Sequence, residues 1–371
     1  MKPKQGYLPT LDGWRAIAIL LVILYHDYLY RFGSFSDRWF NEHGLHGVDI
    51  FFAISGLLIC SRLLEEEVST GSISLKGFYI RRALRILPAA YFYLLTIISL
   101  RLNSIIPLTP KELLASALFY RNYSRFSDTP GHINWYTGHF WSLAVEEHFY
   151  LILPGVLYFI PKRWRVVSLG ALTVMVCMWR LYRQQTRPWE FLMQHTDTRL
   201  DALLFPAILA ILLSRPHLRS LFTRFAKYWW IPAFLFLGLL TTKFERLTPL
   251  AETVLIPLTL SGTLLLPSGY FARFLESTPL RWLGRISYSL YLWQQLFFDG
   301  HFLGYYQPLG FLQTFPFRWL ALFIVATASY YLIEKPFIRL GHALAPPATP
   351  GRHEDQLGLR QRAWHGRPAD S

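Results

Sequence analysis

The fold is decided by the run AIAILLVILYHDYLY at residues 16–30, the first long apolar stretch of the chain. Arg15 stands directly before this run and His26 lies within it, although membrane helices exclude ionisable side chains that have no function. The two residues are eleven positions apart, so they lie on nearly one helix face, about 16 Å apart along the axis. The stretch predicts a membrane helix that carries a cation and a base on one face, which indicates chemistry inside the bilayer.

The composition of the whole chain agrees with a membrane location. Hydrophobic residues make up 53% and charged residues only 16%, below the roughly 25% of soluble domains. The charges lie between apolar runs, so we predict an all-α polytopic membrane protein with about ten transmembrane helices. The expected spans are 16–32, 47–61, 86–100, 139–160, 167–182, 200–213, 228–242, 249–267, 286–298 and 317–333.

Ten spans would place both termini on one side of the membrane. Most of the 37 Lys and Arg residues fall on the cytoplasmic side if the N-terminus is inside, so we expect both termini to be cytoplasmic. The basic residues are dispersed rather than gathered on one polar face, which argues against nucleic-acid binding. Residues 1–343 are expected to form the membrane domain, and 344–371, rich in Pro, Gly, Arg and His, a disordered cytoplasmic tail.

Three further features bound the chemistry. Cys60 and Cys177 lack the spacing of a metal site or a redox pair, so no metal is expected. The run after Lys4 is followed by no small-residue cleavage site, so it is expected to be retained as the first helix. The aromatic residues of the loop at 103–138 suit either a sugar-binding surface or a membrane-interface belt.

Seven local motifs occur along the chain. They are LDGWRAIAILLVILYH (11–26), GVDIFFAISG (47–56), FYIRRALRILP (78–88), FWSLAVEEHFYLILP (140–154), TRLDALLF (198–205), RISYSLYLWQQ (285–295) and IEKPF (333–337). In this order and spacing they resemble the acyltransferase-3 family of integral membrane O-acyltransferases. The resemblance covers about residues 8–340, which is nearly the whole folded part.

The resemblance implies a roughly ten-helix bundle in the bacterial cytoplasmic (inner) membrane. It implies acyl-CoA, usually acetyl-CoA, as the co-substrate, and a hydroxyl of a surface or exported carbohydrate or lipid-linked glycan as the acceptor. This chain departs from the family pattern at Trp14, at Pro206 and at 294–296, where Gln-Gln-Leu replaces the commoner His-x-Pro. A catalytic histidine at that place therefore cannot be carried over. Because only a short tail follows the bundle, we expect a stand-alone form without an added extracytoplasmic domain.

The candidate catalytic residues are His26, Asp49 and Glu146. Burial disfavours a charged imidazole, so His26 is expected to be neutral and able to act as the general base toward a hydroxyl. His26 could instead become acylated and relay the group. Asp49 could orient His26 or cap its own helix, and Glu146 could pair with an intramembrane arginine or bind the acceptor.

The candidate acyl-CoA site consists of Arg15, Arg82 and Arg85. Arg82 and Arg85 are three residues apart on one helix face, and arginines bind phosphate in a bidentate manner. Arg15 could then guide the pantetheine arm toward His26. The alternative for the pair is anchoring by the positive-inside rule.

Trp141, Arg199 and Asp201 are candidates for contact with the acceptor. Arg199 and Asp201 are two residues apart, so they cannot face each other on a helix. Ser55 is expected to bond within its own helix rather than act as a nucleophile.

The sequence therefore predicts a membrane O-acyltransferase, most simply an O-acetyltransferase. Two alternatives stay open: a tailoring acyltransferase of a small metabolite such as a macrolide, and a transporter without covalent chemistry, because buried charges in a bundle also mark substrate paths. The acceptor, the acyl length and the oligomeric state are not set by the sequence.

Overall fold

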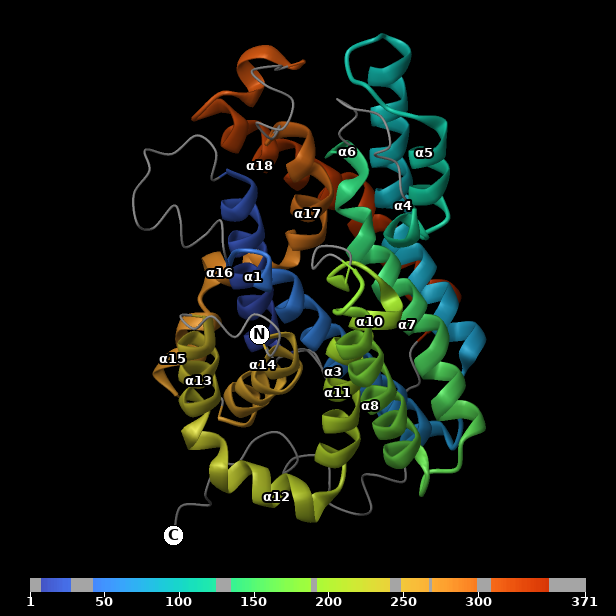
Figure 1. The fold of residues 1–371 in the computed structure, drawn as a ribbon, viewed down its shortest axis with the longest axis vertical. Helices are drawn as coiled ribbons and strands as arrows, with labels where there is room; N and C mark the ends of the chain where they lie inside the picture. The colour runs from blue at the N-terminus through green and yellow to red at the C-terminus, as the bar shows by residue number, and fades with distance from the viewer. Residues whose placement is uncertain are drawn as a thin grey trace.

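A computed structural model describes residues 8–27, 43–124, 135–187, 192–240, 248–266, 269–298 and 308–346. Within these ranges the regular structure is entirely helical, which confirms the predicted all-α class. Figure 1 shows an elongated bundle in which α12 (Pro216–Phe225) runs across one end. Most of the longer helices run roughly along the long axis of the molecule, as expected of a membrane protein.

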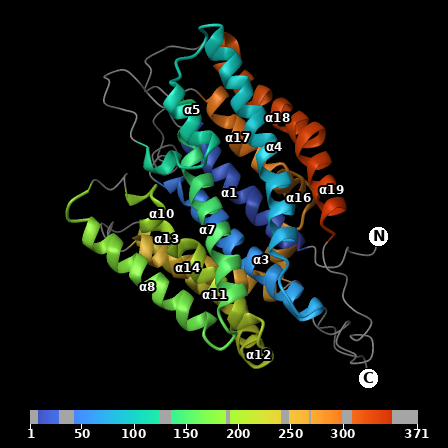
Figure 2. The same ribbon diagram turned by 90° about the vertical axis from the view of Figure 1, so that its right-hand side faces the viewer.

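The centre of the bundle is formed by α1 (Pro9–Asp27), α3 (His46–Thr70) and α7 (Phe140–Phe159). Figure 2 shows these helices between α8 (Arg165–Arg183) on one flank and α18 (Phe317–Ser329) with α19 (Lys335–Leu344) on the other. The first helix is thus enclosed by protein, and its polar residues face other helices rather than lipid.

The remaining elements complete the bundle. They are α4 (Leu75–Leu102), α5 (Pro110–Ala117), η2 (Arg121–Tyr123), α6 (Trp135–Gly138), α10 (Thr196–Arg199), α11 (Asp201–Leu213), η3 (Ala226–Tyr228), α13 (Trp230–Leu240), α14 (Thr248–Leu265), α15 (Tyr270–Leu275), α16 (Thr278–Arg285), α17 (Ser287–Phe297), η5 (Gly310–Gln313) and the π-helical turn η6 (Tyr330–Glu334).

Two glycines of the second motif let α3 approach its neighbours closely. A Cβ at Gly47 would collide with the carbonyl oxygen of Ala18 in α1, and one at Gly56 would collide with that of Leu203 in α11. Only glycine permits backbones to pack at this separation. The motif GVDIFFAISG therefore fixes α3 against both α1 and α11.

The turn between α3 and α4 is encoded locally. Gly71 ends α3 in the left-handed region at φ 80° and donates its N–H to Glu67, as a helix C-cap glycine does. Three residues later the Ser74 side chain accepts a hydrogen bond from the Gly77 N–H and caps α4. This tight turn folds α4 back along α3, so that Arg81 of α4 forms a salt bridge with Glu66 of α3 at 3.1 Å.

The expected number of spans is not confirmed. Five helices in the described ranges are long and apolar enough to cross a membrane, and the bent pair of α11 with 216–228 would make a sixth. The predicted spans at 200–213, 228–242 and 286–298 are helices of only 13, 11 and 11 residues. In α1 and α7, charged residues lower the mean hydropathy. Length and composition therefore support a membrane protein but not the count of ten.

Both chain termini lie outside the described residues, and so does most of the tail expected at 344–371. The cytoplasmic placement of the termini and the boundary of the membrane domain at residue 343 stay predictions.

Candidate active site

His26 lies in the last turn of α1 with a defined tautomer. Its Nδ1 is 2.8 Å from the carbonyl oxygen of Val22. Because a carbonyl oxygen can only accept, Nδ1 must carry the proton and donate it. The neutral ring therefore holds its free lone pair on Nε2, which is the atom that a general base or a nucleophile needs.

The Nε2 of His26 faces Gln295 of α17. The two Nε2 atoms are 3.5 Å apart. The other amide atom of this glutamine, Oε1, accepts from the backbone N–H of His139 at 3.1 Å and lies 2.6 Å from its Nδ1. A backbone N–H can only donate, so the amide is oriented with its oxygen toward His139 and its NH₂ toward His26.

His139 and Gln295 were not predicted from the sequence. His139 is buried and stands directly before the motif that begins at Phe140, so the nearest sequence signal is a histidine at the start of an apolar helix. Trp135 adds to the same cluster, since its Nε1 donates to the carbonyl oxygen of Gln295 at 2.7 Å and its ring lies edge-on to His26 with centroids 5.4 Å apart. The cluster thus joins α1, α6, the start of α7 and α17.

A buried cation lies in the loop segment that leads to this cluster. Arg121 of η2 donates from Nε to the hydroxyl of Thr137 at 3.2 Å. Burial lowers the pKa of Arg121 to about 10, so the side chain is still charged at neutral pH. The His26 cluster therefore has a fixed positive charge nearby, next to α6.

The three arginines expected to bind acyl-CoA lie together. Arg15 pairs with Asp12 at 3.2 Å and interacts electrostatically with Arg85. The guanidinium of Arg82 stacks on the ring of Tyr150, 3.7 Å from its centroid, and interacts electrostatically with Arg85. Gathering like charges is unfavourable unless anions balance them. α1 and α4 thus form a half-buried basic cluster.

Glu146 belongs to this basic cluster and not to the His26 cluster. Its carboxylate accepts from Ser55 at 2.9 Å and from Tyr150 at 3.0 Å, and it interacts electrostatically with Arg82 and Arg15. Ser55 therefore bonds to α7, whereas a bond within its own helix was expected. Glu146 follows His139 by seven residues along α7, which is about 10 Å.

Asp49 lies in a third cluster and does not orient His26. It forms a salt bridge with Arg199, whose other Nη is 3.6 Å from Glu252. His46 is 2.8 Å from Glu252 and 3.6 Å from Asp49. The expected pairing of Asp49 with His26 is replaced by the Val22 carbonyl, because α3 packs beside α1 with Asp49 turned toward α10 and α14.

His46, Asp49 and Glu252 offer three potential metal-ligand atoms within 4.8 Å of one another. The guanidinium of Arg199 already pairs with both carboxylates. It supplies the positive charge that a metal ion would bring, so we read the group as an ion-pair cluster.

Asp201 pairs with a different arginine. Both its oxygens bind Arg180, at 2.9 and 2.7 Å, and both side chains are fully buried. Thr253 of α14 donates to the same carboxylate at 2.7 Å. Arg199 and Asp201 thus face different partners, as their spacing predicted. Their charged groups tie α3, α8, α11 and α14 together.

Two other features carry no obvious acid or base. Trp141 is half-buried and packs edge-on against Phe52, with centroids 6.2 Å apart.

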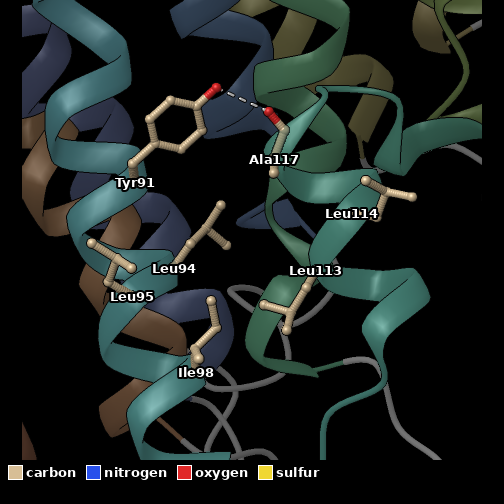
Figure 3. Close-up of a pocket in the computed structure, with 7 residues that line it drawn as sticks. All are labelled: Tyr91, Leu94, Leu95, Ile98, Leu113, Leu114 and Ala117. Atoms are coloured by element: carbon tan, nitrogen blue, oxygen red, sulfur yellow. Dashed lines mark hydrogen bonds between the residues drawn. The ribbon is translucent and has the colours of Figure 1, made fainter.

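A groove of about 360 Å³ lies between α4 and α5. Figure 3 shows its leucine and isoleucine walls, where the Tyr91 hydroxyl donates to the carbonyl oxygen of Ala117 at 3.2 Å. The groove is apolar, so the reactive groups must be sought in the three polar clusters.

The fold and the polar clusters define a helical membrane protein whose first helix carries both His26 and Arg15, one member of the basic cluster. Residues 8–335 match the family described as Acyltransferase domain. The chain belongs to this family.

Curated relatives agree with the family. The protein named "Putative O-acetyltransferase SACOL0978" of Staphylococcus aureus strain COL is 32% identical over 91% of this chain. O-acetyltransferase OatA of S. aureus strain NCTC 8325 is 29% identical over 90% of it. The chain spans 58% of the length of each relative. No solved structure matches the chain.

Proposed function

We propose that the chain is an O-acetyltransferase of the bacterial cytoplasmic membrane. It moves an acetyl group from acetyl-CoA to a hydroxyl of a cell-surface or exported carbohydrate. Membership of the acyltransferase family and the names of the curated relatives support the reaction class. The donor and the acceptor are inferred from the two ends of the site.

The observation that carries this proposal is the tautomer of His26. The Val22 carbonyl holds the proton on Nδ1 and leaves the Nε2 lone pair free in the protein interior. A neutral imidazole in this state can accept a proton from a hydroxyl. General-base catalysis of this kind raises the rate of a reaction by roughly 10² to 10⁴.

The donor end is the basic cluster of Arg15, Arg82 and Arg85. Phosphate groups of the CoA nucleotide would accept charge-assisted hydrogen bonds from these arginines. Arg15 and His26 both belong to α1, about 16 Å apart along its axis. An extended pantetheine arm can cover such a distance, so the thioester would lie next to His26.

The acceptor end is expected beside Trp135. Its indole ring lies against His26, and aromatic rings commonly stack on sugar rings, since they combine an apolar face with a polar group. Trp141 packs inside the bundle and is a weaker candidate for the acceptor. Arg199 and Asp201 are held in buried ion pairs, so we assign them to fixing the helices around the site.

Two routes are compatible with this arrangement. In direct transfer, His26 takes the hydroxyl proton, the oxygen attacks the thioester carbon, and the departing thiolate receives the proton. In a relay, Nε2 of His26 attacks the thioester first and thiolate leaves. The acceptor oxygen then displaces the imidazole, whose Nε2 takes the hydroxyl proton and passes it to the thiolate. Glu146 lies in the basic cluster, so its proposed role is to hold Arg82 and Arg15 in place.

Purified protein in lipid nanodiscs provides the test. Acetyl-CoA and a surface polysaccharide should give free thiol and an O-acetyl ester, and His26→Gln should lower the rate at least a hundredfold. Gln keeps the size and hydrogen-bonding capacity but cannot accept a proton at neutral pH. The control is His148→Gln, since the Nδ1 of His148 bonds to Thr196 at 2.7 Å instead. Full activity of His26→Gln would refute the assignment, and a transporter would consume no thioester.

A further inference from the structure

Two consecutive glutamines of α17 lie beside His26, and the proposed chemistry has not used them. Gln294 is fully buried, and neither its amide oxygen nor its nitrogen forms a hydrogen bond of good geometry with the described residues. The side chain lies next to His26, within reach of a hydrogen bond to its ring. Burying an amide without satisfying its hydrogen-bonding groups is unfavourable, so such an amide next to a reactive nitrogen indicates a group that binds substrate.

Gln295 is held in one orientation. Its Oε1 accepts from the backbone N–H and Nδ1 of His139, and its backbone carbonyl accepts from Trp135. The amide NH₂ is therefore presented toward the Nε2 of His26 at 3.5 Å, which is too long for a strong hydrogen bond. The NH₂ group therefore lies beside Nε2 of His26 without forming a strong hydrogen bond to it, so it can donate to a bound acyl group.

We propose that the amide groups of Gln294 and Gln295 form an oxyanion site for the acyl group. The inference rests on the proposed function, because it assigns the donors that bind the thioester carbonyl oxygen while His26 acts. Preorganised donors aimed at the position where negative charge develops contribute strongly to acyl transfer. His139 and Trp135 are then positioning residues, because they hold Gln295 and do not touch the acyl group.

The step in which the donors act can be written for direct transfer. A bond forms between the acceptor oxygen and the thioester carbon, and the carbonyl π electrons move onto the carbonyl oxygen. The two amides donate hydrogen bonds to this oxyanion. The C=O bond then re-forms, the C–S bond breaks, and the thiolate takes the proton that His26 removed from the hydroxyl. In the relay route the same donors serve the adduct of His26 Nε2.

The test compares Gln294→Met and Gln295→Met in the nanodisc assay. Methionine keeps the length and volume of glutamine but supplies no donor. Each variant should lower kcat by roughly 10² to 10³ with little change in the KM for acetyl-CoA, because the contact is made only in the transition state. Gln294→Met leaves the hydrogen bonds between Gln295 and His139 intact, so it stays informative if Gln295→Met folds poorly.

Gln313→Met is the matched control. Gln313 is also buried, and its Nε2 donates to the carbonyl oxygen of Leu296 at 2.9 Å, so it holds the same helix without facing His26. This variant should lose thermal stability and keep its kcat. A kcat within twofold of wild type for Gln294→Met, or a raised KM at unchanged kcat, overturns the oxyanion site. Absence of acetyl transfer in the wild-type protein would instead refute the proposed function.

Discussion

The basic cluster makes a quantitative prediction for the binding of CoA. Replacing Arg82 and Arg85 together by alanine removes two guanidinium groups from one face of α4. Each charge-assisted hydrogen bond to a phosphate is worth about 1.5 to 3 kcal/mol, so two bonds at the lower value sum to about 3 kcal/mol. Both arginines are half-buried, so solvent screening reduces this figure. We expect the Kd for CoA to rise at least tenfold, equivalent to about 1.4 kcal/mol.

Arg81→Ala provides the matched control for this double variant. Arg81 neighbours Arg82 in α4, but its guanidinium donates to Glu66 at 3.1 Å and to the carbonyl oxygen of Ala345 at 3.2 Å. The substitution removes a similar charge from the same helix and should leave CoA binding nearly unchanged. The same comparison separates a CoA site from positive-inside anchoring, since anchoring would make all three arginines equivalent.

Isothermal titration calorimetry with CoA is the appropriate assay, because it reports binding without turnover. The double variant must first elute as a single species from size exclusion, since Arg82 also stacks on Tyr150 and such a contact contributes roughly 1 kcal/mol to folding. If the folded double variant binds CoA as tightly as Arg81→Ala does, the basic cluster is not the acyl-CoA site.

Three further predictions concern the scaffold. Arg180→Met should destabilise the protein by about 3 to 5 kcal/mol because it leaves the fully buried Asp201 without its partner; a thermal shift within one or two degrees of wild type would contradict this. Gly56→Ala should reduce the yield of folded protein, since its Cβ would collide with the backbone of α11; normal yield and melting temperature would show that α3 can move away. In a cysteine-free background, a cysteine at Ser104 should react with a membrane-impermeant thiol reagent on whole cells and one at Gly351 should not; equal labelling would refute the orientation with both termini inside.

Much of the membrane character and part of the site could be predicted from the sequence. The periodic apolar runs require helices, since only helices satisfy their own backbone hydrogen bonds in lipid. The spacing of Arg15 and His26 placed both residues on α1, because helical geometry is local. The spacing of Arg82 and Arg85 likewise defined one face of α4. Relations set within a few turns of one helix were therefore accessible from the sequence alone.

Contacts between helices were not accessible in the same way. Asp49 was expected near His26, yet it pairs with Arg199, because the rotation of α3 about its axis is set by the close packing at Gly47 and Gly56. Glu146 has two acceptor oxygens that any facing donor could satisfy. Only the packed bundle assigns them to Ser55 and Tyr150.

The sequence alone was sufficient for the helical membrane class, the family and the position of Arg15 and His26 on one helix. The environment of His26 required the folded bundle, which supplies the Val22 carbonyl that fixes its tautomer and the Gln295 amide that faces its lone pair. Gln295 follows His26 by 269 positions. Sequence spacing carries no information on such a pair, because its geometry arises from the packing of α1, α7 and α17 against one another.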